Sequence, residues 1–117
     1  MSIARIDVGP RMSGAVVHGD TVYLAGQVAK LAAGKSVAEQ TREILEIIDG
    51  LLARAGTDKT RMLSATIYLA DIRGFAEMNS VWDAWVAQGH TPARATVEAK
   101  LAAPQYTVEI ACIAAKP

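Results

Sequence analysis

Two short runs of alternating apolar and polar residues, Ser13–Val17 and Thr21–Gly26, lie near the start of the chain. The residues between them, His18 to Asp20, include the Gly and Asp that typically join paired strands. This pattern predicts a β-hairpin whose second strand closes at Gly26-Gln27.

The apolar spacing then changes to three and four residues, which predicts an amphipathic helix of about five turns. Ser36 and Glu39 match a capping box, in which both side chains satisfy backbone donors at a helix start. Gly56 is a typical C-terminal stop. The face expected to pack on the core comprises Ala38, Thr41, Leu45, Ile48, Leu52 and Ala55.

Alternation returns over Met62–Ala70, which predicts a strand. Its expected core face comprises Leu63, Ala65, Ile67 and Leu69. Helical spacing follows over roughly four turns and ends at Gly89, so a second helix should pack an aromatic face on the sheet. That face comprises Phe75, Met78, Trp82, Trp85 and Val86. The runs Ala93–Lys100, opened by Pro92, and Thr107–Ala114 predict two more strands.

This order of elements predicts one α+β domain over residues 1–117, with two helices on one face of a mostly antiparallel mixed sheet. Two helices cannot cover both faces of such a sheet. The residues expected on the uncovered face are small or moderately apolar: Ala93, Ala95, Ala111 and Ile113. We therefore expect self-association through this face, with a closed ring as the simplest symmetric solution.

Composition narrows the choice of compartment and partner. The 12 basic and 12 acidic residues balance, which argues against an electrostatic grip on nucleic acid or on an anionic membrane. Cys112 is the only cysteine, so it cannot form an intramolecular disulfide and is expected to fill the core. No signal sequence or membrane-spanning run is evident. A soluble, cytoplasmic protein is expected.

Arg94 is the first candidate for chemistry, because it opens a strand among mostly apolar neighbours. Its planar guanidinium can hold a carboxylate through two parallel hydrogen bonds, which lysine cannot reproduce. A salt bridge to a nearby Asp or Glu is an equally good interpretation of the sequence alone.

Glu109 is the second candidate, since its neighbours Val108 and Ile110 are expected to be buried. A partly desolvated carboxylate there could orient or deprotonate a water molecule. An outward-facing glutamate paired with Lys100 or another cation is at least as common for this pattern. Asn79 flanks the buried face of the second helix and could form hydrogen bonds at a cleft or to a loop.

The remaining signals are weak. His90 is expected to be a structural or capping residue, and His18 a solvated turn residue. No Ser-His-Asp order, Gly-rich phosphate loop or metal-ligand spacing is present, so we expect no metal site.

Three segments together resemble the RidA (YjgF/YER/UK-type) family: Gly14–Gln27 with its closing Ala25-Gly26-Gln27, Ala65–Asp71 followed by Phe75 and Asn79, and Thr91-Pro92-Ala93-Arg94 followed by Val108-Glu109-Ile110. The likeness runs nearly end to end, and the closing segment is its most specific part. Trp82-Asp83-Ala84-Trp85 and Gly89-His90 further resemble the YoaB-like branch.

The resemblance implies a chorismate-mutase-like α+β fold and a homotrimer with clefts between subunits. Family enzymes hydrolyse reactive 2-imino and enamine acids to 2-keto acids and ammonia without a metal or organic cofactor. Carried over, Arg94 would hold the substrate carboxylate and Glu109 would serve the attacking water. Gly26, Thr96 and Asn79 would line or flank the cleft.

Two departures from the founding members bear on activity. Arg11, with Met12 beside it, stands where they carry an aromatic residue against the substrate, and Ala25 replaces their serine. The leading hypothesis is a deaminase of the 2-iminobutanoate/2-iminopropanoate type. The alternative is a non-catalytic module that binds a small carboxylate and regulates or protects a partner. A ribonuclease function is disfavoured, because no basic track or stacking platform is evident.

Overall fold

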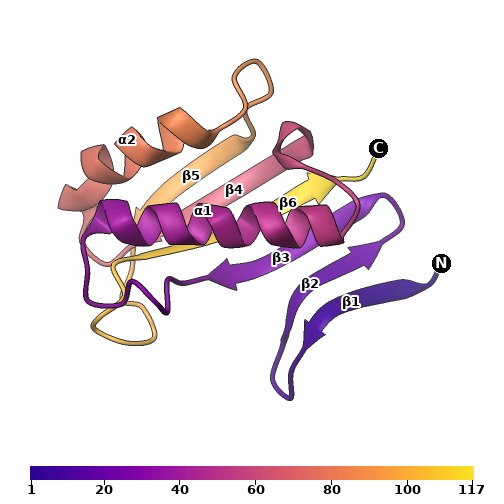
Figure 1. Ribbon diagram of the computed structural model, residues 1–117, viewed down its shortest axis with the longest axis horizontal. Helices are drawn as coiled ribbons and strands as arrows, with labels where there is room; N and C mark the ends of the chain where they lie inside the picture. The colour runs from indigo at the N-terminus through magenta and orange to yellow at the C-terminus, as the bar shows by residue number, and fades with distance from the viewer.

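The computed structural model describes residues 1–117 and confirms a single α+β domain with a six-stranded mixed sheet and two helices (Figure 1). The elements are β1 (Ile3–Val8), β2 (Ser13–His18), β3 (Thr21–Gln27), α1 (Val37–Arg54), β4 (Met62–Leu69), α2 (Phe75–Trp85), β5 (Ala93–Glu98) and β6 (Val108–Ala115). The strand order is β1-β2-β3-β6-β4-β5, and only the pairing of β4 with β5 is parallel.

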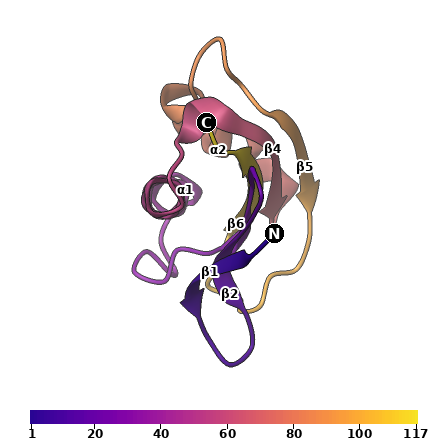
Figure 2. The same cartoon turned by 90° about the vertical axis from the view of Figure 1, so that its right-hand side faces the viewer.

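Both helices lie on one face of the sheet, as Figure 2 shows. The predicted face of α1 packs there, with Leu45, Ile48 and Leu52 almost completely buried. Ile44, which was not predicted to belong to this face, is buried as well. Opposite them, β4 contributes Ile67, which is 0% exposed. Each such side chain contributes roughly 1.5–3 kcal/mol by leaving water, so this face holds the hydrophobic core.

The other face carries no element of the chain. Ala93 and Ala95 are exposed there as predicted, and Ala111 and Ile113 are half-buried. Three larger apolar side chains join them, since Tyr23, Leu63 and Val97 are 46%, 53% and 43% exposed. We call this surface the bare face. These exposed apolar side chains fit the expectation that this face takes part in self-association.

The strand β1 was not predicted. Its residues are exposed except for half-buried Ile6, so no run of core positions marks it. Charged Arg5 and Asp7 suit an edge strand, where they discourage pairing with another chain. Asp7 also has φ 53°, an unusual backbone conformation for a residue other than glycine.

Two further predictions were wrong in detail. Leu63 was expected in the core, but the register between β4 and β6 shifts between Met62 and Ser64, so Met62 is buried and Leu63 is exposed. The second helix ends at Trp85, about one turn early, and Phe75 at its start is 42% exposed. Phe75 lies beside Arg94 instead of in the core.

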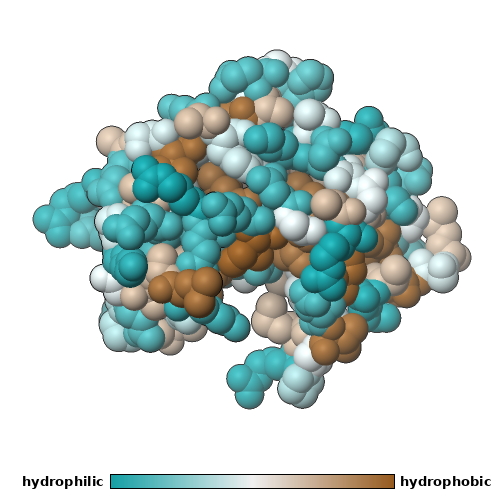
Figure 3. Space-filling view, in the orientation of Figure 1, coloured by the Kyte–Doolittle hydropathy of each residue, from teal (hydrophilic) through white to brown (hydrophobic).

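The N-terminal hairpin, formed by β1 and β2, is joined to α1 by one bidentate ion pair. Arg54 donates from Nη1 and Nη2 to the two carboxylate oxygens of Asp7, at 2.9 and 2.8 Å. Hydrogen bonding to Arg54 lowers the pKa of Asp7. Elsewhere the hairpin diverges from the helix layer, and apolar side chains are visible where the two separate (Figure 3).

Candidate ligand site

Arg94 is held against α2 by three neighbours. Its Nη1 donates to Asn79 Oδ1 at 2.8 Å. Its guanidinium carbon also lies 5.4 Å from the ring centroid of Trp82 and 5.8 Å from that of Phe75. Aromatic faces attract a guanidinium within about 6 Å, so amide and rings together fix its plane. Asn79 thus forms its hydrogen bond to the candidate arginine and not to a loop.

Most of the hydrogen-bonding capacity of Arg94 is unused within the chain. A guanidinium has five N–H donors, and the contact with Asn79 is the only hydrogen bond that Arg94 makes. The salt bridge considered for it does not form, since the chain's ion pairs are Arg54–Asp7 and Arg73–Asp71. An oriented, half-buried guanidinium with free donors is suited to a carboxylate.

Thr96 supports the same interpretation. It lies two residues after Arg94 on β5 and shares its face, as predicted. Its Oγ1 is buried without a hydrogen-bond partner, as is that of Thr107, which is uncommon; a group from a ligand or a neighbouring chain is one way to satisfy it. Because β5 is the last strand of the sheet, its outer edge is open to such a group.

Glu109 occupies a different place, on the bare face beside Gly26. A Cβ at Gly26 would collide with the Glu109 carboxylate and lie 2.9 Å from its Cδ. Glycine is therefore needed for the glutamate to lie across β3. The predicted alternative of pairing with Lys100 does not occur, because Glu109 makes no ion pair. Gly26 and Glu109 thus form one local unit.

The sheet register places Arg94 and Glu109 on opposite faces. Arg94 pairs with Ala65, which pairs with Cys112, and both partners are buried beneath the helices. Glu109 pairs with Tyr68 and belongs to the other alternation of the same strands. Since neighbouring residues along a strand face opposite ways, one chain cannot bring these two side chains to one ligand.

Arg11 and Met12 lie in a third place. They belong to the exposed turn between β1 and β2, at the edge of the sheet opposite β5. The chain therefore gathers Arg94, Thr96 and Asn79 in one group and Gly26 with Glu109 in another, and it leaves the turn apart from both.

Sequence reasoning missed the two aromatic neighbours of Arg94 as site residues. Phe75 and Trp82 were assigned to the core, yet both contact the guanidinium. The signal was present, because Phe75, Asn79 and Trp82 are spaced by four and three residues and so lie on one helix face.

The remaining candidates, Cys112, His18 and His90, lie outside both groups of site residues. Cys112 is 3% exposed, and burial raises the pKa of its thiol to about 12, so it is a core residue as predicted. His90 and His18 are exposed. No three His, Cys, Asp or Glu side chains gather as metal ligands, and neither helix is long and apolar enough to cross a membrane.

Comparison of the sequence and the fold with known proteins identifies relatives of this chain. The family model Endoribonuclease L-PSP matches residues 3–116. The chain is 46% identical to a RutC family protein of Haemophilus influenzae, over 97% of this chain and 98% of that one. It is 47% identical to the RutC family protein YoaB of Escherichia coli, over 98% and 99%. A YjgF family member from Neisseria meningitidis superposes with TM-score 0.96 at 48% identity, covering 100% and 97%.

Proposed function

Because the chain belongs to the RidA/YjgF family, described by the Endoribonuclease L-PSP model, and to its YoaB-like branch, we propose that it is an imine/enamine deaminase. It hydrolyses reactive 2-imino acids of the 2-iminobutanoate and 2-iminopropanoate type to 2-keto acids and ammonia. The observation that carries this proposal is the oriented guanidinium of Arg94, whose remaining N–H groups make no hydrogen bond within the chain and can donate to a planar anion.

The proposal assigns the substrate carboxylate to Arg94. Asn79, Trp82 and Phe75 hold the guanidinium plane before substrate arrives, so little conformational freedom is lost on binding. The hydroxyl of Thr96 supplies a second polar contact on the same strand face. Holding the carboxylate fixes the position of the neighbouring imine carbon.

The other half of the site comes from a second copy of the chain. Glu109 and Gly26 lie on the bare face, which is broad and apolar enough to require a cover. A ring of identical subunits places the bare face of one copy against its neighbour at every interface. We propose a homotrimer in which Glu109 of the partner subunit approaches the β5 edge that carries Arg94.

The reaction then needs only positioning and proton transfer. Water adds through its oxygen to the imine carbon, and the C=N π electrons move to nitrogen. Glu109 of the partner subunit accepts a proton from the water and returns one to the nitrogen. Glu109 of the partner subunit then transfers the carbinolamine hydroxyl proton to the amino nitrogen, the O–H electrons form C=O, the C–N bond breaks and ammonia leaves. The substrate is already labile, so fixing carbon and water in line supplies much of the acceleration.

A coupled assay tests the proposal. An amino-acid oxidase generates the imino acid in situ, and keto-acid formation is compared for wild type, Arg94→Ala and Arg94→Lys. Loss of a charged carboxylate contact worth about 3 kcal/mol lowers kcat/KM about 100-fold in Arg94→Ala. Arg94→Lys keeps the charge but loses the fork, so it recovers only part of the activity. Equal rates with and without wild-type protein would contradict the proposal.

The alternative function is a non-catalytic module that binds a small carboxylate and regulates or protects a partner. The observation that favours it is the departure from the founding members at Arg11, Met12 and Ala25, which changes the shape of the expected cleft. It predicts that wild type binds a 2-keto acid through Arg94 and does not accelerate hydrolysis. Turnover that disappears in a folded, oligomeric Arg94→Ala protein would exclude it.

A further inference from the structure

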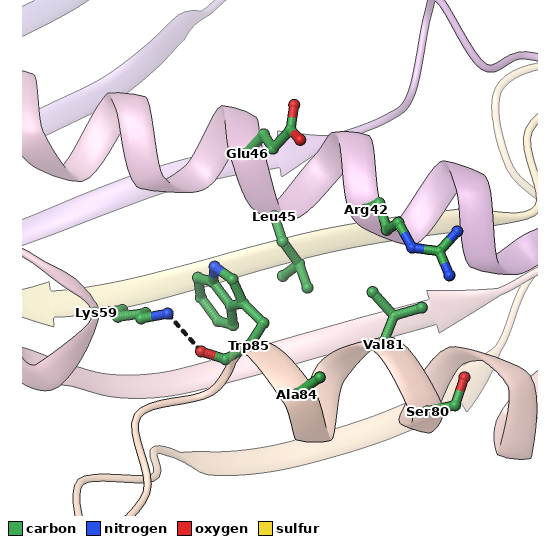
Figure 4. Close-up of a pocket in the computed structure, with 8 residues that line it drawn as sticks. All are labelled: Arg42, Leu45, Glu46, Lys59, Ser80, Val81, Ala84 and Trp85. Atoms are coloured by element: carbon green, nitrogen blue, oxygen red, sulfur yellow. Dashed lines mark hydrogen bonds between the residues drawn. The ribbon is translucent and has the colours of Figure 1, made fainter.

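A groove of about 350 Å³ lies between α1 and α2, on the helix surface that faces away from the sheet (Figure 4). On α2, small Ser80 and Ala84 are four residues apart and leave space along the side of the helix. Leu45 of α1 and Val81 of α2 line the groove between them, and both are nearly buried. A volume of this size suits a ligand with few non-hydrogen atoms.

One end of the groove is a rigid wall built around Trp85. The indole Nε1 donates to Asp49 Oδ2 at 2.9 Å, and Lys59 lies 4.9 Å from a Trp85 ring centroid. Lys59 Nζ also donates to the Trp85 carbonyl oxygen at 2.5 Å. The wall therefore presents an immobilised aromatic surface beside a cation whose remaining N–H groups are free.

The other end carries Arg42, whose guanidinium makes no hydrogen bond or ion pair within the chain. Glu46 follows it by four residues on α1, a spacing at which opposite charges often pair, yet the two do not pair. In Figure 4 the Glu46 carboxylate points away from the guanidinium. Two cations, Arg42 and Lys59, thus bracket a floor of apolar side chains.

We propose that this groove binds a small monocarboxylate with a branched or aromatic apolar body, at a site separate from Arg94. The carboxylate bonds to the Arg42 guanidinium through its planar fork. The apolar body lies over Leu45, Val81 and Ala84 and reaches the Trp85 ring. Arg42 supplies the preference for an anion, and the lining supplies the preference for a hydrocarbon body over acetate.

The two tryptophans distinguish this groove from the Arg94 group. Trp85 lines the groove, whereas Trp82 lies beneath Arg94, and their ring centroids are 5.5 Å apart. These are the only tryptophans in the chain, so a ¹H–¹⁵N spectrum contains two indole signals, which a Trp82→Phe variant assigns. A ligand in the groove shifts the Trp85 signal most strongly.

The experiment titrates 4-methylpentanoate and 3-phenylpropanoate into Arg94→Ala protein, in which the other proposed carboxylate anchor is absent. A saturable shift of the Trp85 indole signal is expected, with a dissociation constant on the order of 1 mM or tighter. The isosteric 4-methylpentanamide, which lacks the charge, and acetate, which lacks the apolar body, should each bind at least about tenfold more weakly.

Two variants at exposed positions separate charge from shape. Arg42→Leu removes the anchor and Ala84→Met fills the groove, and each should weaken binding at least about tenfold. Arg5→Leu, which removes a cation from β1, should leave binding unchanged.

Absence of saturation up to about 10 mM would overturn the proposal. Equal binding of the amide, or unchanged binding in Arg42→Leu, would also overturn it. Because the test uses binding to protein that lacks Arg94, its outcome does not depend on whether the chain is a deaminase.

Discussion

The two faces of the sheet differ in how far a single chain buries their side chains and supplies contacts for them. On the helix-covered face, Ile67 and its neighbours are fully buried, and Arg94 already has an amide and two aromatic rings around it. On the bare face, Tyr23 and Val97 are nearly half exposed. The Glu109 carboxylate lies against Gly26, in the space that a Cβ at that position would fill.

This difference supports the proposal that folding completes one half of the site and leaves the other half for assembly. Arg94 gains its orientation from α2, an element of its own chain. Glu109 belongs to the face that has no cover in its own chain, and the sheet register keeps it from Arg94. If both act on one substrate, they must come from different copies.

The largest effect is expected from a charge on the bare face. Ala111→Glu places a carboxylate at the centre of the predicted interface, where an unpaired buried charge is strongly unfavourable. The variant should keep its circular dichroism spectrum, run as a monomer in size-exclusion chromatography with light scattering, and lose deaminase activity to background. Ala53→Glu, at an exposed position of α1, should change neither property. A fully active Ala111→Glu oligomer would contradict the assignment of this face.

A smaller effect, on stability instead of assembly, is expected on the helix-covered face. Ile67→Ala should lower the free energy of unfolding by about 2–5 kcal/mol, because it leaves a cavity among packed side chains. Val97→Ala on the bare face should lower it by only about 0.5 kcal/mol or less. Both are measured by urea unfolding in the Ala111→Glu background, which removes the contribution of assembly. Equal losses would show that the two faces are not different within one chain.

The close approach of Gly26 to Glu109 gives the next contrast. Gly26→Ala forces the carboxylate to move, so kcat/KM should fall about tenfold, equivalent to about 1.4 kcal/mol, with the oligomeric state unchanged. Gly50→Ala is the matched control, since a Cβ there meets nothing within 4 Å. It should raise stability by about 0.5–1 kcal/mol as a helical glycine replacement and leave activity unchanged. Unchanged activity in Gly26→Ala would remove Glu109 from the mechanism.

The smallest effect concerns the tie between the hairpin and α1. The pKa of Asp7 in the folded chain lies below its ordinary value of 3.8, chiefly because of hydrogen bonding to Arg54. The stabilisation is therefore fully present above the ordinary pKa of 3.8 and is lost as the pH falls from there through the lowered pKa of the folded chain. Amide hydrogen exchange in β1 should therefore become faster, relative to β6, as the pH falls from 5 to about 3.

Asp7→Asn is the control for that measurement. Asparagine tolerates the positive φ at this position, so the fold should be retained. The variant should have the faster relative exchange of β1 at every pH in the range. A pH dependence identical to that of wild type would show that the ion pair does not hold the hairpin.

Much of the fold could be predicted because burial leaves a period in the sequence. The helix α1 and the strand β6 bury one regular stripe each, and their predicted faces are correct. The strand β1 buries almost nothing and so carries no such period. Leu63 was misplaced because a register shift near the start of β4 turns it outward, and alternation alone cannot reveal an irregularity of pairing.

The candidate site was predictable only in part. The contact between Asn79 and Arg94 agrees with the expected cleft, and Thr96 shares the face of Arg94. Alternation alone already implied that Glu109 lies on the opposite face, because it alternates with Val108 and Ile110 and shares the face of Ala111 and Ile113, whereas Arg94 lies between Ala93 and Ala95. Which residues of β4, β5 and β6 pair with one another could not be predicted, because a helix and loops join these strands and no tight turn fixes their register.

The central claim, that each site combines Arg94 of one copy with Glu109 of another, is tested most directly by mixing two inactive variants. Arg94→Ala and Glu109→Gln proteins are unfolded together and refolded at equal amounts, so that subunits combine at random. About a quarter of the interfaces then hold an intact Arg94 opposite an intact Glu109, and activity should recover to about a quarter of the wild-type value. Activity no greater than the sum of the two separately refolded variants would show that the residues do not meet across an interface.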